Sequence, residues 1–389
     1  MASSSPKLVS AVDESGAVVC TYSQDANNGS YNAIPPKKTT GSYAKGLLDV
    51  FLPAGYPHTV TADYMPYQIY DSLQAFSSSI AGLMSNRAVL QGFGVGKAGS
   101  SATGAVLLSV LQETTGRLAT ILFAHRFGQA IEPECKYYRF LADILNDSAL
   151  LLDVLTPSLP QGPKILALCA AGVLRSLCGV AAGAAKASLS AHFAKNGNLA
   201  ELNAKDGSQE TVISLMGMLV GSLVVHVVEG RTAVWIWMFG LLGIHLWTNY
   251  QAVRAVQMRT LNRQRAGIIV EEYRRSGRVL YPAEVAKKER ILTWKPPPII
   301  FSRTFPQSGQ LSTSVLRAHE HKNHVVSELG ATKVIFLKAG ATTRDALTAY
   351  MDALEAFSDD EFWKALASAG WDLNAGALET GPAIRIVVD

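Results

Sequence analysis

The sequence is poor in charged residues. Only 17% of its 389 residues are Asp, Glu, Lys or Arg, against about 25% in ordinary soluble domains. The mean hydropathy is correspondingly positive, at +0.16. Such a composition favours lipid contact or an unusually large core. The net charge is only +4 and the isoelectric point about 8.7, whereas a nucleic-acid-binding domain is expected above about 9, so we predict no nucleic-acid partner.

Cysteine is also scarce, with four residues in the whole chain: Cys20, Cys135, Cys169 and Cys178. None of them forms a C-x-x-C pair, and two lie inside an apolar segment. This pattern excludes a disulfide scaffold or a cysteine zinc site and predicts reduced, buried thiols. We therefore predict no metal.

The N-terminal segment lacks the apolar run of a secretory signal. Its first 41 residues are rich in Ser, Asn and Gly, which is typical of a flexible tail.

Common catalytic motifs are missing too. The chain has no G-x-S-x-G, no H-E-x-x-H and no P-loop. A literal G-x-G-x-x-G at Gly94, Gly96 and Gly99 follows RAVLQGF, which is at best a short strand, and no β-α alternation comes after it. A packing or turn role is favoured over nucleotide binding.

Isolated basic and histidine residues give weaker signals. His319, His321 and His324 are expected on a solvated surface rather than around a metal. Lys195 and Lys205 lack the surroundings of a Schiff-base site. His226 and His245 stand alone in apolar runs, where packing is the usual role, although an ionisable group at membrane depth is a functional suspect. We predict no catalytic residue and can name no cofactor.

Long apolar helices dominate the middle of the chain. A transmembrane helix needs about 17–25 apolar residues, and the best matches are Ile165–Ser190, Val212–Val228 and Thr232–Trp247. The repeats Gly179-x-x-x-Gly183 and Gly217-x-x-x-Gly221 suit close helix contacts. A membrane bundle is favoured over a soluble one.

Interface and orientation signals flank the last apolar run. Tryptophans at 235, 237 and 247 suit a membrane interface. The basic segment that follows the run, with Arg254, Arg259, Arg263 and Arg265, predicts that its C-terminal end faces the cytosol or its organellar equivalent.

The pattern changes near residue 281. ERILTWKPPPII suggests a strand stopped by prolines, and residues 295–330 a Pro/Ser-rich connection. Then come a strand at Val334–Leu337, a helix with Thr343 as N-cap, a second helix and a closing strand. We expect a mainly α protein: tail 1–41, helical membrane-type bundle 42–280 and α+β domain 281–389.

One polar stretch, HFAKNGNLAELNAKDGSQET (192–211), interrupts the apolar helices. Helix caps explain part of it, since Asn196-Gly197 is a helix stop and Asn198–Glu201 and Asp206–Gln209 have capping-box spacing. A structural loop is the favoured interpretation. The alternative is a polar site that contacts a ligand, a partner or the charged face of the preceding helix 132–155.

Two groups of candidate ligand- or partner-binding residues follow. We predict that they contact one another, because buried charges persist when they neutralise each other. The groups are Lys136, Arg139, Asp143 and Asp147, and Asn203, Lys205, Asp206, Ser208, Gln209 and Glu210.

These segments also carry a resemblance. The 192–211 stretch, KYYRFLADILNDSALLLDVL, GVAAGAAKASLSAHFA and AVRAVQMRTLNRQRA resemble the root UVB sensitive family between about Leu52 and Ile291. One departure is QETTGR, where Glu113 and Thr114 replace an expected Arg-Asp pair.

The resemblance implies a membrane-associated protein without established catalysis. It implies a role as a scaffold or in the homeostasis of a small metabolite or cofactor such as vitamin B6. Membrane lipid, other family members or a second copy are the expected partners. A small-molecule transporter, or an enzyme that uses the polar stretch, is the alternative.

Overall fold

The structure is a computed structural model. It describes residues 8–12, 18–24, 29–34, 50–93, 102–195, 197–292, 295, 297–304, 311–356, 360–382 and 384–387. Gly94, Gly96 and Gly99 of the glycine patch, and Asn196, lie outside these residues.

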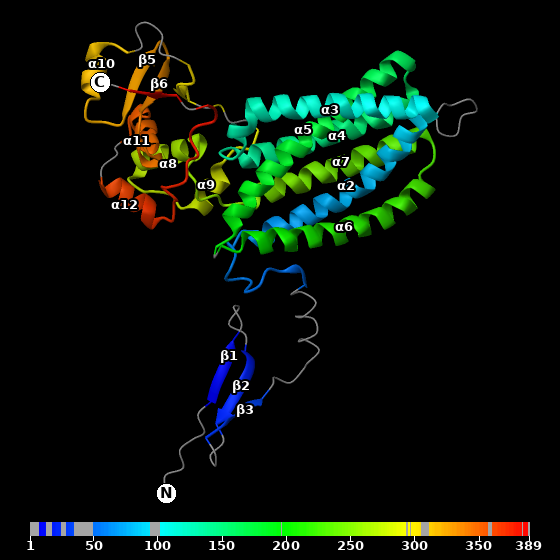
Figure 1. Ribbon diagram of the computed structural model, residues 1–389, viewed down its shortest axis with the longest axis horizontal. Coiled ribbons are helices and arrows are strands. Elements are labelled where there is room, and N and C mark those ends of the chain that lie inside the picture. Colours follow the sequence, from blue (N-terminus) through cyan, green and yellow to red (C-terminus); the bar gives the residue numbers. More distant parts are fainter. Residues whose placement is uncertain are drawn as a thin grey trace.

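Six long helices form a bundle, shown on the right of Figure 1. Helix α2 lies between α6 and α7 and also contacts α4, while α5 lies between α3 and α4. The bundle is therefore built around α2 and α5. Its helices are α2 (Tyr64–Gly92), α3 (Ala102–Ile131), α4 (Cys135–Leu155), α5 (Gln161–Phe193), α6 (Leu199–Val227) and α7 (Arg231–Ala255).

Helix α2 begins earlier than the helical pattern from Asp71 indicated. It starts at Tyr64 and carries Pro66 in its first turn, where a missing N–H costs little because the first helical N–H groups have no intrahelical partner. Arg87–Gly92 belongs to the same helix, so the segment before the glycine patch is helical. The short strand considered for RAVLQGF is therefore wrong. Without a strand before it, the G-x-G-x-x-G sequence is even less consistent with a dinucleotide-binding loop.

The polar stretch at 192–211 is mostly helix. Gly197 adopts a φ of +74°, which makes the expected stop between α5 and α6. From Leu199, however, α6 continues unbroken through the apolar run to Val227. Asn198 is the N-cap residue of α6 as its spacing indicated, but its side chain makes no cap bond. The second predicted capping box is wrong, because Asp206 lies inside the helix.

Glycines allow α6 to approach α2 closely. A Cβ on Gly217 would stand 2.6 Å from Ser79 Cβ and 3.0 Å from the Phe76 carbonyl oxygen, and Gly221 meets α2 one turn later. This pair confirms the small-residue packing motif. Gly179 and Gly183 of α5 instead have no described atom within 4 Å of such a Cβ, so this motif makes no close helix contact within the part of the chain that the structure describes.

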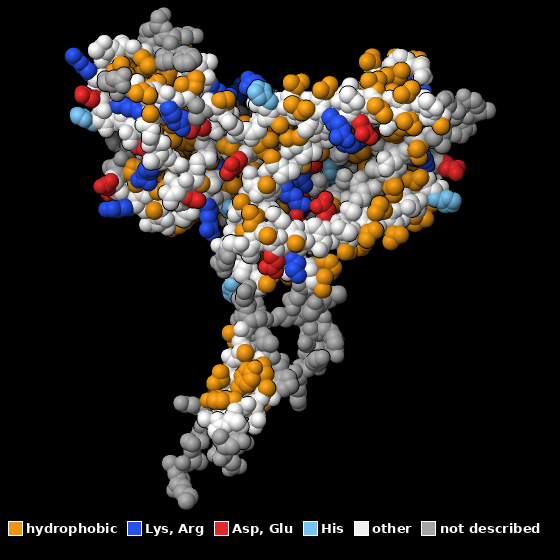
Figure 2. Space-filling view, in the orientation of Figure 1, with side chains coloured by type: hydrophobic (Ala, Val, Ile, Leu, Met, Phe, Trp, Pro, Cys, Tyr) orange, Lys and Arg blue, Asp and Glu red, His pale blue; other side chains and the backbone are white. Residues whose placement is uncertain are grey.

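Apolar side chains cover the outside of several bundle helices. Figure 2 shows them over α3 and along the outer edge of α6. Leu122 of α3 is 69% exposed and Leu219 of α6 is 74% exposed. Among the described residues, α3, α5 and α6 are long and apolar enough to cross a membrane. Helix α7 does not meet that criterion, although its Thr232–Trp247 run was one of the spans expected.

The C-terminal unit is an α+β layer structure on the left of Figure 1. Its sheet has the order β4-β6-β5, with β7 also paired to β6; β5 is antiparallel to β6 and the other two are parallel to it. The elements are α8 (Arg263–Ser276), α9 (Pro282–Lys288), β4 (Ile299–Phe301), α10 (Thr313–Ala318), β5 (His324–Leu329), β6 (Thr332–Lys338), α11 (Thr343–Ala353), α12 (Asp360–Ser368) and β7 (Arg385–Ile386).

One apolar core joins α8 and α9 to this sheet. Buried residues of α8, such as Ile269, pack with Leu347 and Tyr350 of α11 and Phe362 of α12. The C-terminal structural unit therefore begins near Leu261, ahead of the expected boundary at 281.

Several local predictions for this unit needed correction. The strand near 300 follows the prolines instead of preceding them. Strand β5 lies within the expected exposed connection, and its His324 is 2% exposed and pairs with Asp352. Thr342, not Thr343, caps α11 by accepting from Asp345 N. Strand β6 and the two helices α11 and α12 confirm the rest of the pattern.

The N-terminal segment contains strands that its composition did not indicate. β1 (Leu8–Val12), β2 (Val18–Gln24) and β3 (Tyr31–Ile34) form an antiparallel sheet whose first and third strands are largely exposed.

We predict that Gly217→Ala destabilises the bundle by about 1–3 kcal/mol, because the added methyl overlaps a backbone carbonyl of α2 that cannot move freely. Thermal unfolding in mild detergent measures the effect. Gly179→Ala is the matched control and should be neutral or stabilising by up to about 1 kcal/mol through helix propensity. Equal losses at both glycines would refute the close α2–α6 contact.

Candidate functional site

A network of buried polar side chains lies between α2, α4 and α7. Arg139 of α4 donates to Asp71 and Gln74 of α2, at 2.8 and 2.7 Å, and to Asp143 one turn along α4, at 2.9 Å. Asp143 also accepts from Gln74, at 2.7 Å, and from Asn249 of α7. The guanidinium is therefore neutralised inside the bundle by two carboxylates, as burial requires.

His245 extends this network toward Asp147. It is 1% exposed, with Nδ1 2.8 Å from Asp147 Oδ1 and Nε2 3.0 Å from Gln74 Nε2. These neighbours assign the proton to Nδ1. The sequence singled out His245 only as a lone histidine in an apolar run, because its partners are about 100 and 170 residues away.

A second buried charge sits farther along the bundle. Asp153 of α4 is fully buried, accepts from the Ser85 hydroxyl of α2 at 2.7 Å and pairs with Arg175 of α5. Arg175 therefore extends from the apolar α5 to a carboxylate, which resolves its apparent cost in an apolar helix.

Lys136 belongs to a different cluster from the rest of the α4 stripe. Its ammonium group donates to the Val256 carbonyl and to Glu289, which also accepts from Arg265 at 2.9 Å. All three side chains are 6% exposed or less. Burial raises the pKa of Glu289, but Lys136 and Arg265 lower it more, so the net pKa lies below the usual range. One carboxylate thus serves two buried cations and leaves one positive charge over.

The polar half of α6 bonds to α2, α5 and the residues before α2. Asp206 accepts from Gln68 of α2 at 2.7 Å and pairs with Lys186 of α5 at 2.7 Å. Glu210 also pairs with Lys186, at 2.9 Å, and Gln209 donates to the Phe51 carbonyl at 2.6 Å. These contacts hold the start of α6 against the bundle.

The remaining polar residues of this stretch donate to backbone carbonyls or are exposed. Lys205 donates to the Val50 carbonyl at 3.1 Å. The hydroxyls of Ser208 and Thr211 donate to carbonyls one turn earlier in α6, and Asn203 is exposed. Asn203, Ser208 and Thr211 lie on the exposed face of α6, as expected for a solvated helix surface.

The predicted direct contact between the two candidate groups is wrong. Arg139 bonds to Asp71 on α2, whereas Asp206 bonds to Gln68, three residues earlier on the same helix. Helix α2 stands between α4 and α6 and supplies polar partners to both. The partners Gln68, Asp71 and Gln74 of α2 were not predicted from the sequence, because they are spaced among apolar and aromatic residues.

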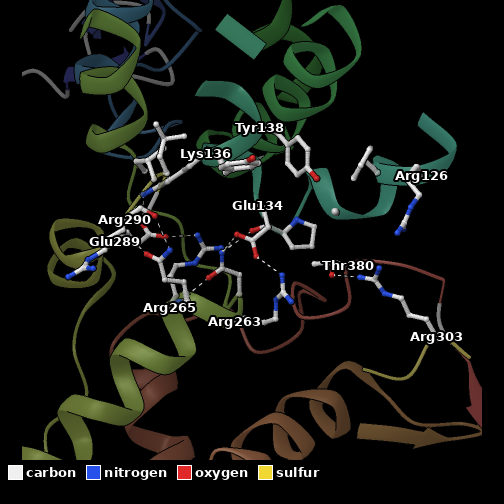
Figure 3. Close-up of a pocket in the computed structure, with 18 residues that line it drawn as sticks. Arg126, Glu134, Lys136, Tyr138, Arg263, Arg265, Glu289, Arg290, Arg303 and Thr380 are labelled. Atoms are coloured by element: carbon white, nitrogen blue, oxygen red, sulfur yellow. Dashed lines mark hydrogen bonds and ion pairs between the residues drawn. The ribbon is translucent and has the colours of Figure 1, made fainter. Parts of the chain in front are cut away.

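A cavity of about 440 Å³ lies where the bundle meets the C-terminal unit, shown in Figure 3. Its residues come from the end of α3, the α3–α4 turn, the start of α4, the start of α8, the segment after α9, and the two connections that bring Arg303 and Thr380 to its rim. We call this the junction pocket. Its lining includes Arg126, Phe127, Glu134, Lys136, Tyr137, Tyr138, Arg263, Arg265, Glu289, Arg290, Arg303 and Thr380.

Asn262 holds the pocket walls together. Its side-chain oxygen caps α8 by accepting from Arg265 N at 2.9 Å, and its amide donates to the Pro133 carbonyl and to Glu134, both at 3.1 Å. Arg263 of the same turn reaches Glu134 at 3.5 Å. The first turn of α8 is thus fixed against the α3–α4 turn, and its arginines face the pocket.

The pocket is strongly cationic. Six Lys or Arg side chains line it against two carboxylates, Glu134 and Glu289, an excess of four positive charges. The pKa of Arg303 is lowered, first by partial burial and then by the positive charges of Arg263 and Arg126. Burial raises the pKa of Glu134 despite the opposing Arg263 and Arg265. The clustered cations, opposed by Glu134 with its raised pKa, favour the binding of an anion.

The side chains that line the pocket suit the binding of an anion. Guanidinium groups match phosphate and carboxylate geometry, and the Tyr138 and Thr380 hydroxyls can add hydrogen bonds. Sequence reasoning assigned Arg263 and Arg265 to membrane orientation only. It missed the pocket because Arg126, Glu289, Arg303 and Thr380 are far apart along the chain.

Comparison with known proteins places the chain in a family. Residues 37–277 match the profile described as "Vitamin B6 photo-protection and homoeostasis domain". The chain belongs to the root UVB sensitive family. The matched residues include the whole bundle and all of α8, so the family match covers both the buried network and one wall of the junction pocket.

Curated relatives support the assignment. "RUS family member 1" of Dictyostelium discoideum is 38% identical over 260 residues, covering 66% of this chain and 49% of that protein. "Protein root UVB sensitive 3" of Arabidopsis thaliana is 36% identical over 247 residues, covering 63% and 56%. The chain thus spans about half the length of these relatives.

A third match reaches the C-terminal unit. "Protein root UVB sensitive 5" of Arabidopsis thaliana is 26% identical over 385 residues, covering 86% of this chain and 75% of that protein. No solved structure matches the chain.

We predict that Glu289→Gln lowers the free energy of unfolding by about 3–5 kcal/mol, because it leaves Lys136 and Arg265 buried without a counter-charge. Chemical denaturation in detergent measures the loss. Glu271→Gln, on the exposed face of α8, should change stability by less than about 0.5 kcal/mol. A neutral Glu289→Gln would show that water reaches the triad.

Asp63 generates a pH prediction. It accepts from His192 at 2.9 Å and from Gln257 N at 2.6 Å, and although burial raises its pKa, the hydrogen bond and charge of His192 lead the contributions that lower the pKa to about 2. Because the unfolded pKa is about 3.9, the carboxylate stabilises the fold by about 2–3 kcal/mol above pH 5. That contribution is lost as the pH falls through 4 toward 2.

Asp63→Asn tests this linkage. The stability gap between the parent protein and the variant should be full at pH 6 and shrink steadily between pH 4 and pH 2, measured by denaturation at each pH. A gap that stays constant across this range would contradict the depressed pKa.

Proposed function

We propose that this protein is a membrane-embedded, non-catalytic member of the family that handles a vitamin B6-related small metabolite. The family-level role in vitamin B6 homoeostasis follows from the matched domain. Insertion into the membrane and the absence of catalysis are our additions, and the polarity of the bundle supports the first of them.

The single observation that carries membrane insertion is the inverted polarity of the bundle. Large apolar side chains stand outside on α3 and α6, while Arg139, Asp143, Asp153 and His245 are buried among the helices. A water-soluble bundle shows the opposite distribution. In a bilayer, ionisable residues face the bundle interior and pair with one another.

The two ends of the bundle also differ. The C-terminal unit joins the end where α3 and α7 finish and α4 and α6 start. Arg254 and Arg259 lie in the basic segment at that end, so the positive-inside rule orients the C-terminal unit toward the cytosol or its organellar equivalent. Lipid would then cover α3 and α6, and pairing with another family member or a second copy would use the same faces.

A charged substitution on the outer face of α6 tests this arrangement. In a bilayer, Leu219→Asp should cost about 2.5–3.5 kcal/mol of insertion free energy and release part of the protein into the carbonate-soluble fraction. Leu329→Asp, on an exposed strand end of the C-terminal unit, should leave extraction unchanged. Carbonate release of the parent protein itself would refute membrane insertion.

The metabolite role and the lack of catalysis have separate tests. Loss of the protein should change cellular vitamin B6 levels, and re-expression should restore them. Mass spectrometry of small molecules that co-purify in mild detergent identifies the cargo. Purified protein incubated with vitamin B6 compounds should leave their masses unchanged; turnover would overturn the non-catalytic role.

Transport is the second candidate, favoured by the buried Arg139–Asp143–His245 network inside the bundle. Helix α6 is continuous from Leu199 to Val227, so most of the polar stretch is not an unwound segment of the kind that lines many transporter paths. Vitamin B6 uptake into proteoliposomes that depends on this protein would support transport, and its absence would leave the binding role.

A further inference from the structure

We propose that the junction pocket binds a soluble aromatic metabolite that carries a phosphate monoester. The inference deepens the proposed function by naming the ligand class and the site, and it rests on that function only for the choice of probe. Charge, aromatic lining and volume support it independently.

The outer rim of the pocket supplies the phosphate contacts. Arg126 from α3 and Arg303 from the segment after β4 both extend to the same side of the cavity in Figure 3. Arg303 already donates to the Thr380 hydroxyl at 2.6 Å, which positions its guanidinium. Arginine recognises a phosphate through parallel N–H donors, so two arginines from different structural units can clamp one.

The inner wall adds an unbalanced positive charge. Glu289 is shared by Lys136 and Arg265, and all three side chains are buried. Because the neutralisation is incomplete, the wall remains cationic where little water screens it. A dianionic phosphate suits such a site better than a monoanionic carboxylate.

Aromatic side chains supply the second half of the recognition. Phe127, Tyr137 and Tyr138 line the same cavity, and Phe127 and Tyr137 are 41% and 37% exposed. Exposed aromatic faces beside arginines favour a flat ring by stacking. The volume of about 440 Å³ lies within the usual range for small-ligand pockets, about 300–1,000 Å³.

Glu134 competes with a bound phosphate for Arg263. It reaches Arg263 at 3.5 Å and sits in the α3–α4 turn at the pocket wall. The negative charge of Glu134 would repel a bound phosphate, and Arg263 would already be paired with Glu134. Removing the charge while keeping the shape should therefore strengthen binding.

The first experiment uses the full chain in mild detergent with pyridoxamine 5′-phosphate as the probe, which cannot form a Schiff base with lysine because it lacks an aldehyde. Isothermal titration should show binding that weakens at least about tenfold in the Arg126→Gln/Arg303→Gln variant. Arg117→Gln is the matched control, since it removes an exposed arginine of α3 away from the pocket, and it should bind within about twofold of the parent.

Two ligand controls separate ring from phosphate. Pyridoxine, which has the ring without the phosphate, and inorganic phosphate should each bind at least about tenfold more weakly than the probe. Equal binding of pyridoxine, or an unaffected double-arginine variant, would overturn the proposal.

Glu134→Gln gives a result in the opposite direction, which a folding defect cannot imitate. It should bind the probe several-fold more tightly than the parent. Unchanged or weaker binding, with the parent's thermal stability retained, would show that Glu134 and Arg263 do not take part in phosphate binding.

A phosphorylated lipid headgroup offers the same phosphate chemistry, so a competition arm distinguishes the sources. Nanodiscs that contain phosphatidylinositol phosphate should not displace the probe at lipid concentrations tenfold above it; displacement there would overturn the soluble aromatic ligand in favour of a headgroup. Carbonate extraction tests the membrane proposal separately, so a protein that inserts without binding the probe refutes only this inference.

Discussion

The neutralisation of charge inside an apolar bundle is the constraint on which this structure depends. Arg139 can be buried only because Asp71, Asp143 and Gln74 surround it, and Asp153 only because Arg175 and Ser85 reach it. An uncompensated charge in these places would cost several kcal/mol. These pairs therefore fix which faces of α2, α4, α5 and α7 must meet, while large apolar side chains remain exposed on the outside of α3 and α6.

Helix α2 has the central part in this arrangement. Its first three turns carry Gln68, Asp71 and Gln74, which partner α6, α4 and α7 in turn, and its middle accepts the glycines of α6. A single helix thus combines polar pairing with close backbone packing. Changes on α2 should propagate to several neighbours, whereas changes on the outer face of α3 should remain local.

Charge neutralisation also connects the bundle to the C-terminal unit. Glu289 follows α9, Arg265 begins α8 and Lys136 begins α4, so one carboxylate joins two structural units. The junction pocket opens beside this triad, and its ligand would touch both units at once. A ligand bound there would therefore couple the helical bundle to the C-terminal unit.

The sequence by itself determined the helical bundle, the apolar helices α5 and α6, the small-residue packing at Gly217 and Gly221, most of the C-terminal elements and the family. Each of these is a local or periodic pattern, which depends on neighbours a few residues apart. The capping roles of Asp206 and Gln209 failed because local spacing was satisfied equally well by a continuous helix, and tertiary contacts to Gln68 and Lys186 selected that helix. Only the tertiary structure decided which polar residues pair. Helix α2 lies between Arg139 and Asp206, and His245 pairs with Asp147. Arg126, Arg263 and Arg303 line one pocket. Electrostatic pairing acts across space with little regard for sequence separation, so only the folded chain decided it.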